Sequence, residues 1–159
     1  MERLLQLLEE NARLPVEDIA AMLGEDTAQV ARRIDEYAKA GIIRGYKALV
    51  DWEKLNAQRV QAVIELRVRP KKSRGFDEIA SAIACFDEVH SVLLMSGAYD
   101  LQLIVSGRSF QEIALFVAKR LSPMDDVLST ATHFVLRTYK KDGVLYVEEE
   151  TDEREWATL

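Results

Sequence analysis

Residues 16–41 have the sequence VEDIAAMLGEDTAQVARRIDEYAKAG, and this stretch decides the fold of the first part of the chain. Its apolar residues recur at the spacing of an α-helix up to Gly24, a residue type that commonly ends helices. Asp26 is a typical N-cap for a second helix, which is expected over residues 27–40 and closed by Gly41. Two short helices joined by a tight turn predict a helix-turn-helix motif.

On either side of this motif the sequence predicts one more helix and one extended segment. Leucines at helical spacing predict a helix over residues 2–10. Residues 42–50 are expected to form a short extended stretch, in the position of a wing. We therefore predict a winged helix-turn-helix domain over residues 1–50, followed by a hinge over residues 51–58.

After the hinge, the hydrophobic pattern changes from a helical to an alternating period. The order that follows is strand, helix, strand, strand, helix, strand, with the segments expected at about 60–68, 76–84, 89–95, 101–106, 109–121 and 127–139. This order is typical of a ferredoxin-like βαββαβ domain. We therefore predict an α+β chain whose second domain spans residues 59–143, with an acidic C-terminal tail over residues 144–159.

The net charge of −6 is concentrated at the C-terminal end. Residues 148–159 contain six acidic residues and one arginine, a run typical of a solvated chain end. Residues 1–45 contain nine acidic and six basic residues. Because no broad basic field surrounds the first domain, any contact that it makes with a nucleic acid has to be local.

The composition places the chain among soluble globular proteins. Hydrophobic residues make up 48% and charged residues 30% of the sequence. No apolar run approaches the roughly 20 residues that span a bilayer. Since no basic and then apolar leader opens the chain either, a cytoplasmic protein without a membrane partner is expected. The single cysteine, Cys85, is expected to be buried on a helix, with a redox role as the alternative.

The second helix of the motif has an apolar and a polar face. Val30, Ile34 and Tyr37 converge on one side when each residue is rotated by about 100°. The opposite side can enter the major groove of DNA, where Gln29 is suited to a base edge and Arg32 to guanine or a phosphate. Including two cations beyond the helix, the candidate DNA-binding residues are Thr27, Ala28, Gln29, Arg32, Arg33, Arg44 and Lys47.

A plainer alternative for this helix stays open. On an isolated amphipathic helix, Arg32 and Arg33 would be ordinary solvated charges. Glu25 and Asp26 at its start would also repel phosphates, although Asp26 favours the helix as a cap. We therefore expect a modest DNA affinity that is sensitive to salt and depends on several subunits binding together.

The turn Ser96-Gly97-Ala98-Tyr99-Asp100 is a candidate binding site for a small molecule. A free amino acid needs an anion for its ammonium group, N–H or hydroxyl donors for its carboxylate and an apolar wall for its side chain. Asp100 supplies the anion, and Gly97 permits close approach of the backbone. The alternative is a plain hairpin turn in which Asp100 bonds its own loop. The candidate residues of this segment are Leu94, Met95, Ser96, Gly97, Ala98, Tyr99 and Asp100.

Motifs for metal binding or catalysis are not found in the sequence. His90 and His133 are the only histidines, and neither has a partner at the spacing of metal ligands. His133 is expected to be a packed or interface residue. Because no glycine-rich phosphate loop and no GxSxG segment occurs, we expect no metal site, no cofactor and no enzymatic activity.

These features together resemble the Lrp/AsnC (feast/famine) family of transcription regulators. The similarity covers almost the whole chain, about residues 2–143, and depends on short pieces in the correct order. These pieces are Asn11-Ala12-Arg13-Leu14, Ile19-Ala20, Val30-Ala31-Arg32-Arg33-Ile34, Ala40-Gly41-Ile42-Ile43-Arg44-Gly45-Tyr46 and Ser96-Gly97-Ala98-Tyr99-Asp100-Leu101. The chain departs from the family at Glu25-Asp26, where Leu-Ser is common, and in its acidic tail.

The resemblance implies a DNA-binding regulator whose assembly or DNA affinity responds to an amino acid or a related small molecule. It also implies dimers formed through the sheets, and commonly tetramers or octamers, with double-stranded DNA and the effector as partners. The effector would bind between ligand domains. At least one of Thr130 and Thr132, on the last strand, is therefore expected near the turn at residues 96–100 across a subunit boundary.

Two other functions stay open at this point. A ligand-sensing assembly module would use the first domain to contact protein rather than DNA, which Glu25 and Asp26 would favour. A haem-precursor decarboxylase-like enzyme would share the architecture, but it would need basic and imidazole groups around a tetrapyrrole. The hairpin at residues 92–100 is poor in both.

Overall fold

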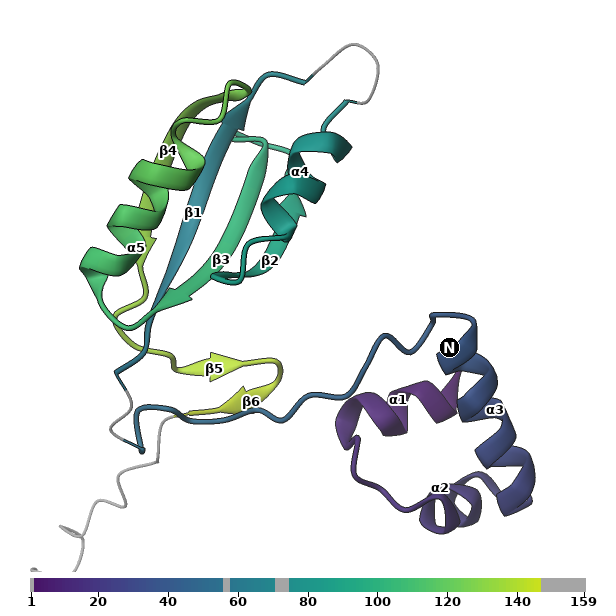
Figure 1. Ribbon diagram of the computed structural model, residues 1–159. Helices are drawn as coiled ribbons and strands as arrows, with labels where there is room; N and C mark the ends of the chain where they lie inside the picture. Colours follow the sequence, from purple (N-terminus) through teal and green to yellow (C-terminus); the bar gives the residue numbers. More distant parts are fainter. Residues whose placement is uncertain (1, 56–57, 71–74, 147–159) are drawn as a thin grey trace, which may run out of the picture. The chain divides into compact units, whose positions relative to one another are not determined.

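The computed structural model describes residues 2–55, 58–70 and 75–146. The chain divides into two compact units, Met1–Val50 and Asp51–Leu159 (Figure 1). Each unit has its own buried apolar cluster. Part of the predicted hinge, residues 56–57, and most of the predicted tail, residues 147–159, lie outside the described ranges. None of the described helices is long and apolar enough to cross a membrane.

The first unit is built from three helices, α1 (Arg3–Glu10), α2 (Val16–Leu23) and α3 (Thr27–Lys39). The turn between α2 and α3 depends on Gly24, whose φ of 68° is rarely adopted by residues with a side chain. The helices bury their apolar faces against one another, in a cluster of Leu4, Leu7, Ile19, Ala20 and Val30. The predicted helix-turn-helix is confirmed.

The segment after α3 differs from the wing that the sequence predicts. It follows Gly41, which has a φ of 69°, and residues 42–50 form no strand. An isolated extended segment has no neighbour for its backbone N–H and C=O groups, and the described part of the first unit contains no strand with which it can pair. The paired strand expected of a wing is therefore not present in these residues of a single chain.

The second unit consists of β1 (Val60–Val68), α4 (Asp77–Ala84), β2 (Val89–Leu94), β3 (Leu101–Gly107), α5 (Phe110–Phe116), a π-helical turn (Val117–Leu121) and β4 (Val127–Phe134). Its four long strands form an antiparallel sheet with the order β2-β3-β1-β4. The two α-helices of this unit, α4 and α5, lie on the same face of the sheet (Figure 1). The predicted ferredoxin-like order is confirmed.

The central strand β1 shows how alternation builds this unit. Ala62, Ile64 and Leu66 are fully buried, whereas the residues between them are less buried. The register pairs Ile64 with Leu103 on one side and with Thr132 on the other. Because directly paired residues lie on the same face of a sheet, a strip of apolar side chains crosses the sheet under α4 and α5. Among the described residues of the second unit, no helix covers the opposite face (Figure 1).

The C-terminal part of the sheet departs from the prediction. β4 ends at Phe134, five residues before the expected end at Tyr139. A short hairpin of β5 (Lys140–Lys141) and β6 (Val144–Leu145) follows, because Asp142-Gly143, with φ values of 47° and 83°, forms its turn. Regular structure therefore continues past residue 143, the expected end of the domain.

The structure corrects the prediction for Cys85 and removes one of the two alternatives for His133. Cys85 is exposed rather than buried, because it is the C-cap of α4 and Ile83 already fills the inward position of that turn. The side chain of His133 is 59% exposed, on the sheet face opposite the helices, and its Nε2 lies 3.6 Å from Glu65 Oε1. His133 is therefore not packed inside the single chain.

Candidate DNA interface and effector site

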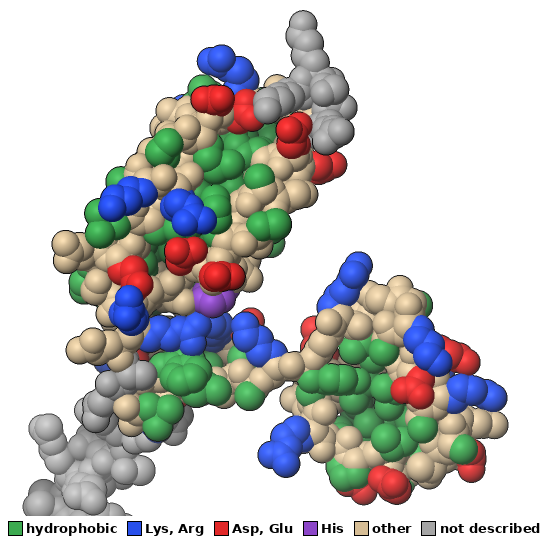
Figure 2. All heavy atoms as spheres, viewed as in Figure 1, with side chains coloured by type: hydrophobic (Ala, Val, Ile, Leu, Met, Phe, Trp, Pro, Cys, Tyr) green, Lys and Arg blue, Asp and Glu red, His purple; other side chains and the backbone are tan. Residues whose placement is uncertain are grey.

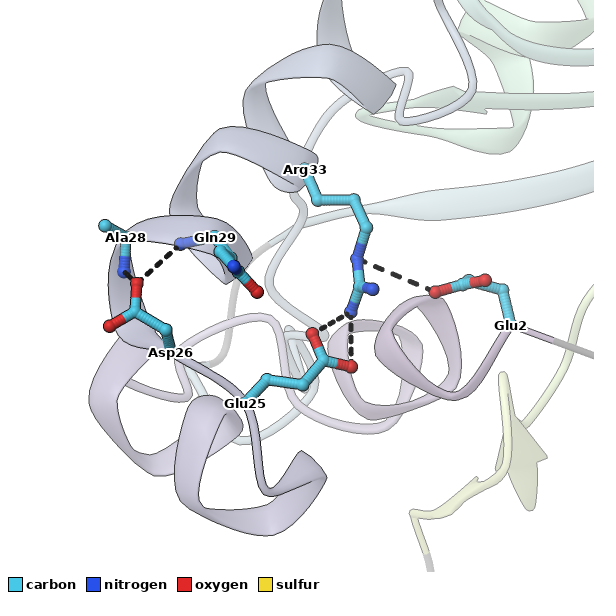
Figure 3. A network of polar contacts seen from close by, with 6 residues as sticks. All are labelled: Glu2, Glu25, Asp26, Ala28, Gln29 and Arg33. Atoms are coloured by element: carbon cyan, nitrogen blue, oxygen red, sulfur yellow. Dashed lines mark hydrogen bonds and ion pairs between the residues drawn. The ribbon is translucent and has the colours of Figure 1, made fainter.

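The start of α3 is closed by its own N-cap. Asp26 Oδ1 accepts hydrogen bonds from the backbone N–H groups of Ala28, at 3.0 Å, and Gln29, at 3.2 Å (Figure 3). This confirms Asp26 as the cap. Unpaired N–H groups at the start of a helix attract anions. Here these two N–H groups already donate to the carboxylate of Asp26. A DNA phosphate is therefore expected to be held by side chains instead.

The two faces of α3 separate as the sequence predicts. Val30 is fully buried, and Ile34 and Tyr37 pack against the same cluster. On the other face Arg32 has a side chain that is 73% exposed, with its Nε 3.7 Å from Glu36 Oε1. An exposed pair of this kind contributes only about 0.3–0.5 kcal/mol, so Arg32 can turn toward a ligand at little cost. Thr27, Ala28 and Gln29 are exposed on the same half of the helix.

Arg33 has a different environment from its neighbour Arg32. Its side chain is 31% exposed, and its Nη2 lies 2.9 Å from Glu25 Oε2. Its Nε lies 3.8 Å from a carboxylate oxygen of Glu2, at the start of α1 (Figure 3). Arg33 thus ties together α1, the turn and α3, so its first role is to hold the motif together. Of the two arginines, Arg32 is therefore better suited than Arg33 to contact a base or a phosphate.

This network accounts for the two acids that depart from the family pattern. The charge of Glu25 is balanced by Arg33, and the carboxylate of Asp26 is bound to the backbone of α3. Both acids therefore have partners inside the unit. Their repulsion of a phosphate is weaker than two unpaired carboxylates would produce.

We expect the pair Arg33–Glu25 to stabilise the first unit measurably. Each side chain is only about a third exposed, so its coupling free energy is expected at about 1 kcal/mol, at the upper end for partly exposed pairs. The measurement is a double-mutant cycle of Arg33→Ala and Glu25→Ala by thermal and urea unfolding. The matched control is Arg3 with Glu10, 60% and 68% exposed and 3.9 Å apart, for which no measurable coupling is expected. Equal coupling in both cycles would contradict the structural role given to Arg33.

The two cations beyond α3 are exposed and lie in the segment without regular structure. The Arg44 guanidinium folds back over Gly41, with its Cζ 3.6 Å from the position that a Cβ there would occupy. Lys47 is exposed on its segment. In the view of Figure 2, charged side chains of both signs are interspersed over the first unit. This mixed surface agrees with a local contact rather than a broad basic field.

The turn at residues 96–100 is held closely against β1. Met95 N–H donates to the Asp100 carbonyl at 2.8 Å, and Asp100 N–H donates to the Leu66 carbonyl at 2.9 Å. Asp100 Oδ2 accepts from Val68 N–H at 2.9 Å, where the register of β1 shifts. The Asp100 carboxylate therefore has a structural role through one oxygen, as the plain-hairpin alternative predicts. Within the described residues, Oδ1 accepts no hydrogen bond.

Arg67 is a residue of this site that the sequence analysis missed. Its Nε donates to the Ala98 carbonyl at 2.9 Å, across from β1 to the turn. Alternation only indicated that Arg67 points away from the core. The predicted ferredoxin-like topology contained a signal, because in this fold the first strand lies beside the third. The observed pairing of β1 with β3 brings Arg67 next to the residues that precede Leu101.

The remaining candidate residues of the turn differ in their exposure to solvent. Ser96, Gly97 and Ala98 are exposed, and Leu94 is 62% exposed. Tyr99 and Met95 are half-buried, and the Tyr99 hydroxyl accepts a hydrogen bond from Gln102 Nε2 at 3.2 Å. The turn thus offers accessible backbone beside the exposed apolar side chain of Leu94.

Thr130 and Thr132 are not brought to this turn within one chain. They pair with Leu66 and Ile64, so they lie on the helix-covered face, on the far side of β1 from β3. The two threonines therefore share a face of β4. Their expected approach to the turn across a subunit boundary stays a prediction.

Comparison with known proteins identifies both units. The AsnC-type helix-turn-helix domain matches residues 2–37, and the Lrp/AsnC ligand binding domain matches residues 61–145. The HTH-type transcriptional regulator YugG of Bacillus subtilis (strain 168) is 43% identical over 152 residues, which are 95% of this chain and 92% of that protein.

Solved structures agree with this result. A transcriptional regulator from Neisseria meningitidis, crystallised as a complex with L-Met, is 28% identical with a TM-score of 0.70 and covers 87% of this chain and 88% of its own. AsnC of E. coli has a TM-score of 0.66 at 24% identity, covering 87% of this chain and 91% of its own, which supports the fold.

Proposed function

The chain belongs to the Lrp/AsnC family of transcriptional regulators, and on this premise we propose that a free amino acid, bound at residues 96–100, controls its DNA affinity or its assembly. The protein is a helix-turn-helix transcriptional regulator with a ligand-binding domain of this family. The observation that carries the proposal is the accessible turn with one Asp100 oxygen still available, next to exposed Leu94. The relative solved with L-Met supports an amino acid as the ligand class.

We propose that DNA is contacted through the exposed half of α3. Gln29 and Arg32 present an amide and a guanidinium there, the groups that pair bidentately with adenine and guanine. Arg44 and Lys47 would contact the sugar-phosphate backbone, and Thr27 and Ala28 would permit close approach. Arg33 would support this surface indirectly, by holding the turn in place.

We propose that copies of the chain assemble through the uncovered face of the sheet. A single sheet in a domain needs both faces shielded unless one is polar, and this face contains the half-buried apolar residues Val63 and Ile104. Glu65 and His133 pair on it as well. A two-fold dimer would set two recognition helices at a fixed separation, so operators should be roughly two-fold symmetric. Higher assemblies, tetramers or octamers, would place Thr130 or Thr132 of one copy near the turn of another.

The competing functions receive less support from the geometry. Glu25 and Asp26 were the best argument for an assembly module that binds protein instead of DNA, and both acids are used inside the motif. For an enzyme, the turn would need a reactive group, but its one carboxylate is bonded to the backbone of β1. We therefore propose a regulator without catalytic activity.

The test is a binding experiment with and without each amino acid. An operator is first selected from random DNA with the full-length protein, and its affinity and the size of the complex are then measured by mobility shift and size-exclusion chromatography. We expect at least one amino acid to change the affinity or the assembly through a coupling free energy of about 1–3 kcal/mol. If DNA binds but no amino acid changes either quantity, the sensing proposal is wrong.

A further inference from the structure

The second unit contains a shallow pocket of about 370 Å³ that is separate from the turn at residues 96–100. Ser106 and Gly107 lie at the end of β3, whereas the turn lies directly before its first residue, Leu101. A strand of seven residues spans about 20 Å, so the pocket and the turn are at opposite ends of the sheet. The pocket is lined by Trp52, Gln58, Arg59, Ser106, Gly107, Arg108 and Glu112.

Arg59 is held at this pocket by groups that carry no negative charge. Its guanidinium carbon lies 5.2 Å from the centre of the Trp52 ring. Its Nη2 lies 3.4 Å from His90 Nε2 and 3.5 Å from Ser106 Oγ. His90 Nε2 and Ser106 Oγ are in turn hydrogen-bonded to each other. Among the residues that the structure describes, no carboxylate forms an ion pair with Arg59. A guanidinium that is positioned but not neutralised is suited to bind an anion.

The second arginine of the pocket already has an anionic partner. Glu112 accepts hydrogen bonds from the backbone N–H of Arg108 and from its side chain, with Nη2 3.2 Å from Oε1. The backbone hydrogen bond, then the side-chain bond, holds the pKa of the Glu112 carboxyl below its ordinary value. Glu112 therefore stays ionised near neutral pH and balances Arg108. One net positive charge, that of Arg59, remains unbalanced among the lining residues.

We propose that this pocket binds a small organic monocarboxylate, with its carboxylate on Arg59 and its apolar part against Trp52. The single unbalanced charge matches one carboxylate, whereas a doubly charged phosphate would also face Glu112. An ammonium group has no available anion here, because Glu112 is already bonded to Arg108. The volume lies at the small end of the range for ligand pockets, about 300–1,000 Å³. The ligand class thus differs from the amino acid proposed for residues 96–100.

The experiment uses Trp52 as the reporter of binding. The chain has two tryptophans, so Trp156→Phe in the otherwise intact protein leaves the fluorescence of Trp52 alone. Benzoate is the probe, and benzamide is its neutral counterpart of the same shape. We expect a saturable change of fluorescence and a rise in melting temperature with benzoate, and neither with benzamide. The same response to both compounds, or no saturable response to benzoate, would overturn the proposal.

Arginine variants locate the binding site. We expect Arg59→Gln to weaken benzoate binding by about 10-fold or more, since a charge-assisted hydrogen bond is lost. Arg137→Gln is the matched control, because Arg137 also stacks on an aromatic ring, that of Tyr139, and its loss removes the same charge. Equal weakening in the two variants would mean general ionic attraction and would refute the site. Asp100→Asn should leave benzoate binding unchanged, so this test can fail or succeed independently of the amino-acid proposal.

Discussion

Arg32→Ala is expected to weaken operator binding by about 30-fold to 25,000-fold, the largest effect of any single substitution on the proposed DNA surface. A well-placed bidentate arginine contributes about 1–3 kcal/mol of discrimination at a base pair. A symmetric dimer would lose this contact in both half-sites, so one substitution removes twice the binding free energy of a single contact. Because the side chain is 73% exposed and its partner Glu36 is also exposed, folding should be little changed. The measurement is a titration of the selected operator at fixed salt.

The control for this prediction is Arg3→Ala. Arg3 is 60% exposed on α1, so its removal changes the net charge of the same unit equally without touching α3. We expect it to change operator affinity only slightly, through the long-range electrostatic contribution. If the two variants weaken binding equally, net charge and not the face of α3 determines DNA affinity.

Asp100→Asn is expected to remove the response to the amino acid. The asparagine side-chain oxygen can still accept the hydrogen bond from Val68 N–H, so the turn keeps its attachment to β1. The negative charge that would hold the ligand's ammonium group is lost, and a hydrogen bond to a charged group contributes about 1.5–3 kcal/mol. The apparent affinity for the amino acid should therefore fall by about 10-fold to 100-fold. Ligand-dependent thermal stabilisation gives this affinity directly.

Two further variants make the result unambiguous. Asp87→Asn removes an exposed carboxylate of the same unit, and we expect it to leave the response intact. Asp100→Ala should lose both the response and part of the stability, because Val68 N–H then loses its acceptor. A folded Asp100→Asn protein that responds as the wild type does would exclude Asp100 as the ligand for the ammonium group.

The arrangement of helices and strands could be predicted largely from local patterns. Gly24 and Asp26 mark the turn of the motif, and the alternation of Ala62, Ile64 and Leu66 marks the central strand. In each case a short segment determines the local structure. Gly24 adopts a left-handed conformation, Asp26 caps a helix, and apolar residues at every second position indicate a strand with one buried face. Such features need no knowledge of distant residues.

Most of the predictions that were wrong or incomplete depend on distant residues. The role of Arg33 requires Glu2, from another helix, and that of Arg67 requires the carbonyl of Ala98 across the sheet. Residues 42–50 form no wing strand because the described part of the first unit has no second strand with which they can pair. The sequence of residues 42–50 alone does not show whether such a partner strand exists. Cys85 is apolar in character but lies at a helix end, where one residue decides between burial and exposure.

A DNA cleavage reagent attached to α3 tests the central proposal most directly. In a Cys85→Ser background, which removes the exposed native thiol, Gln29→Cys carries an iron chelate that cuts nearby DNA. Lys119→Cys, an exposed site on the second unit, serves as the control position. We predict two groups of cuts in the operator, separated by about one helical turn, 10–10.5 base pairs, or a multiple of it, from position 29 and none from position 119. Operator that is bound but left uncut by the reagent at position 29 would contradict the proposal that α3 enters the groove.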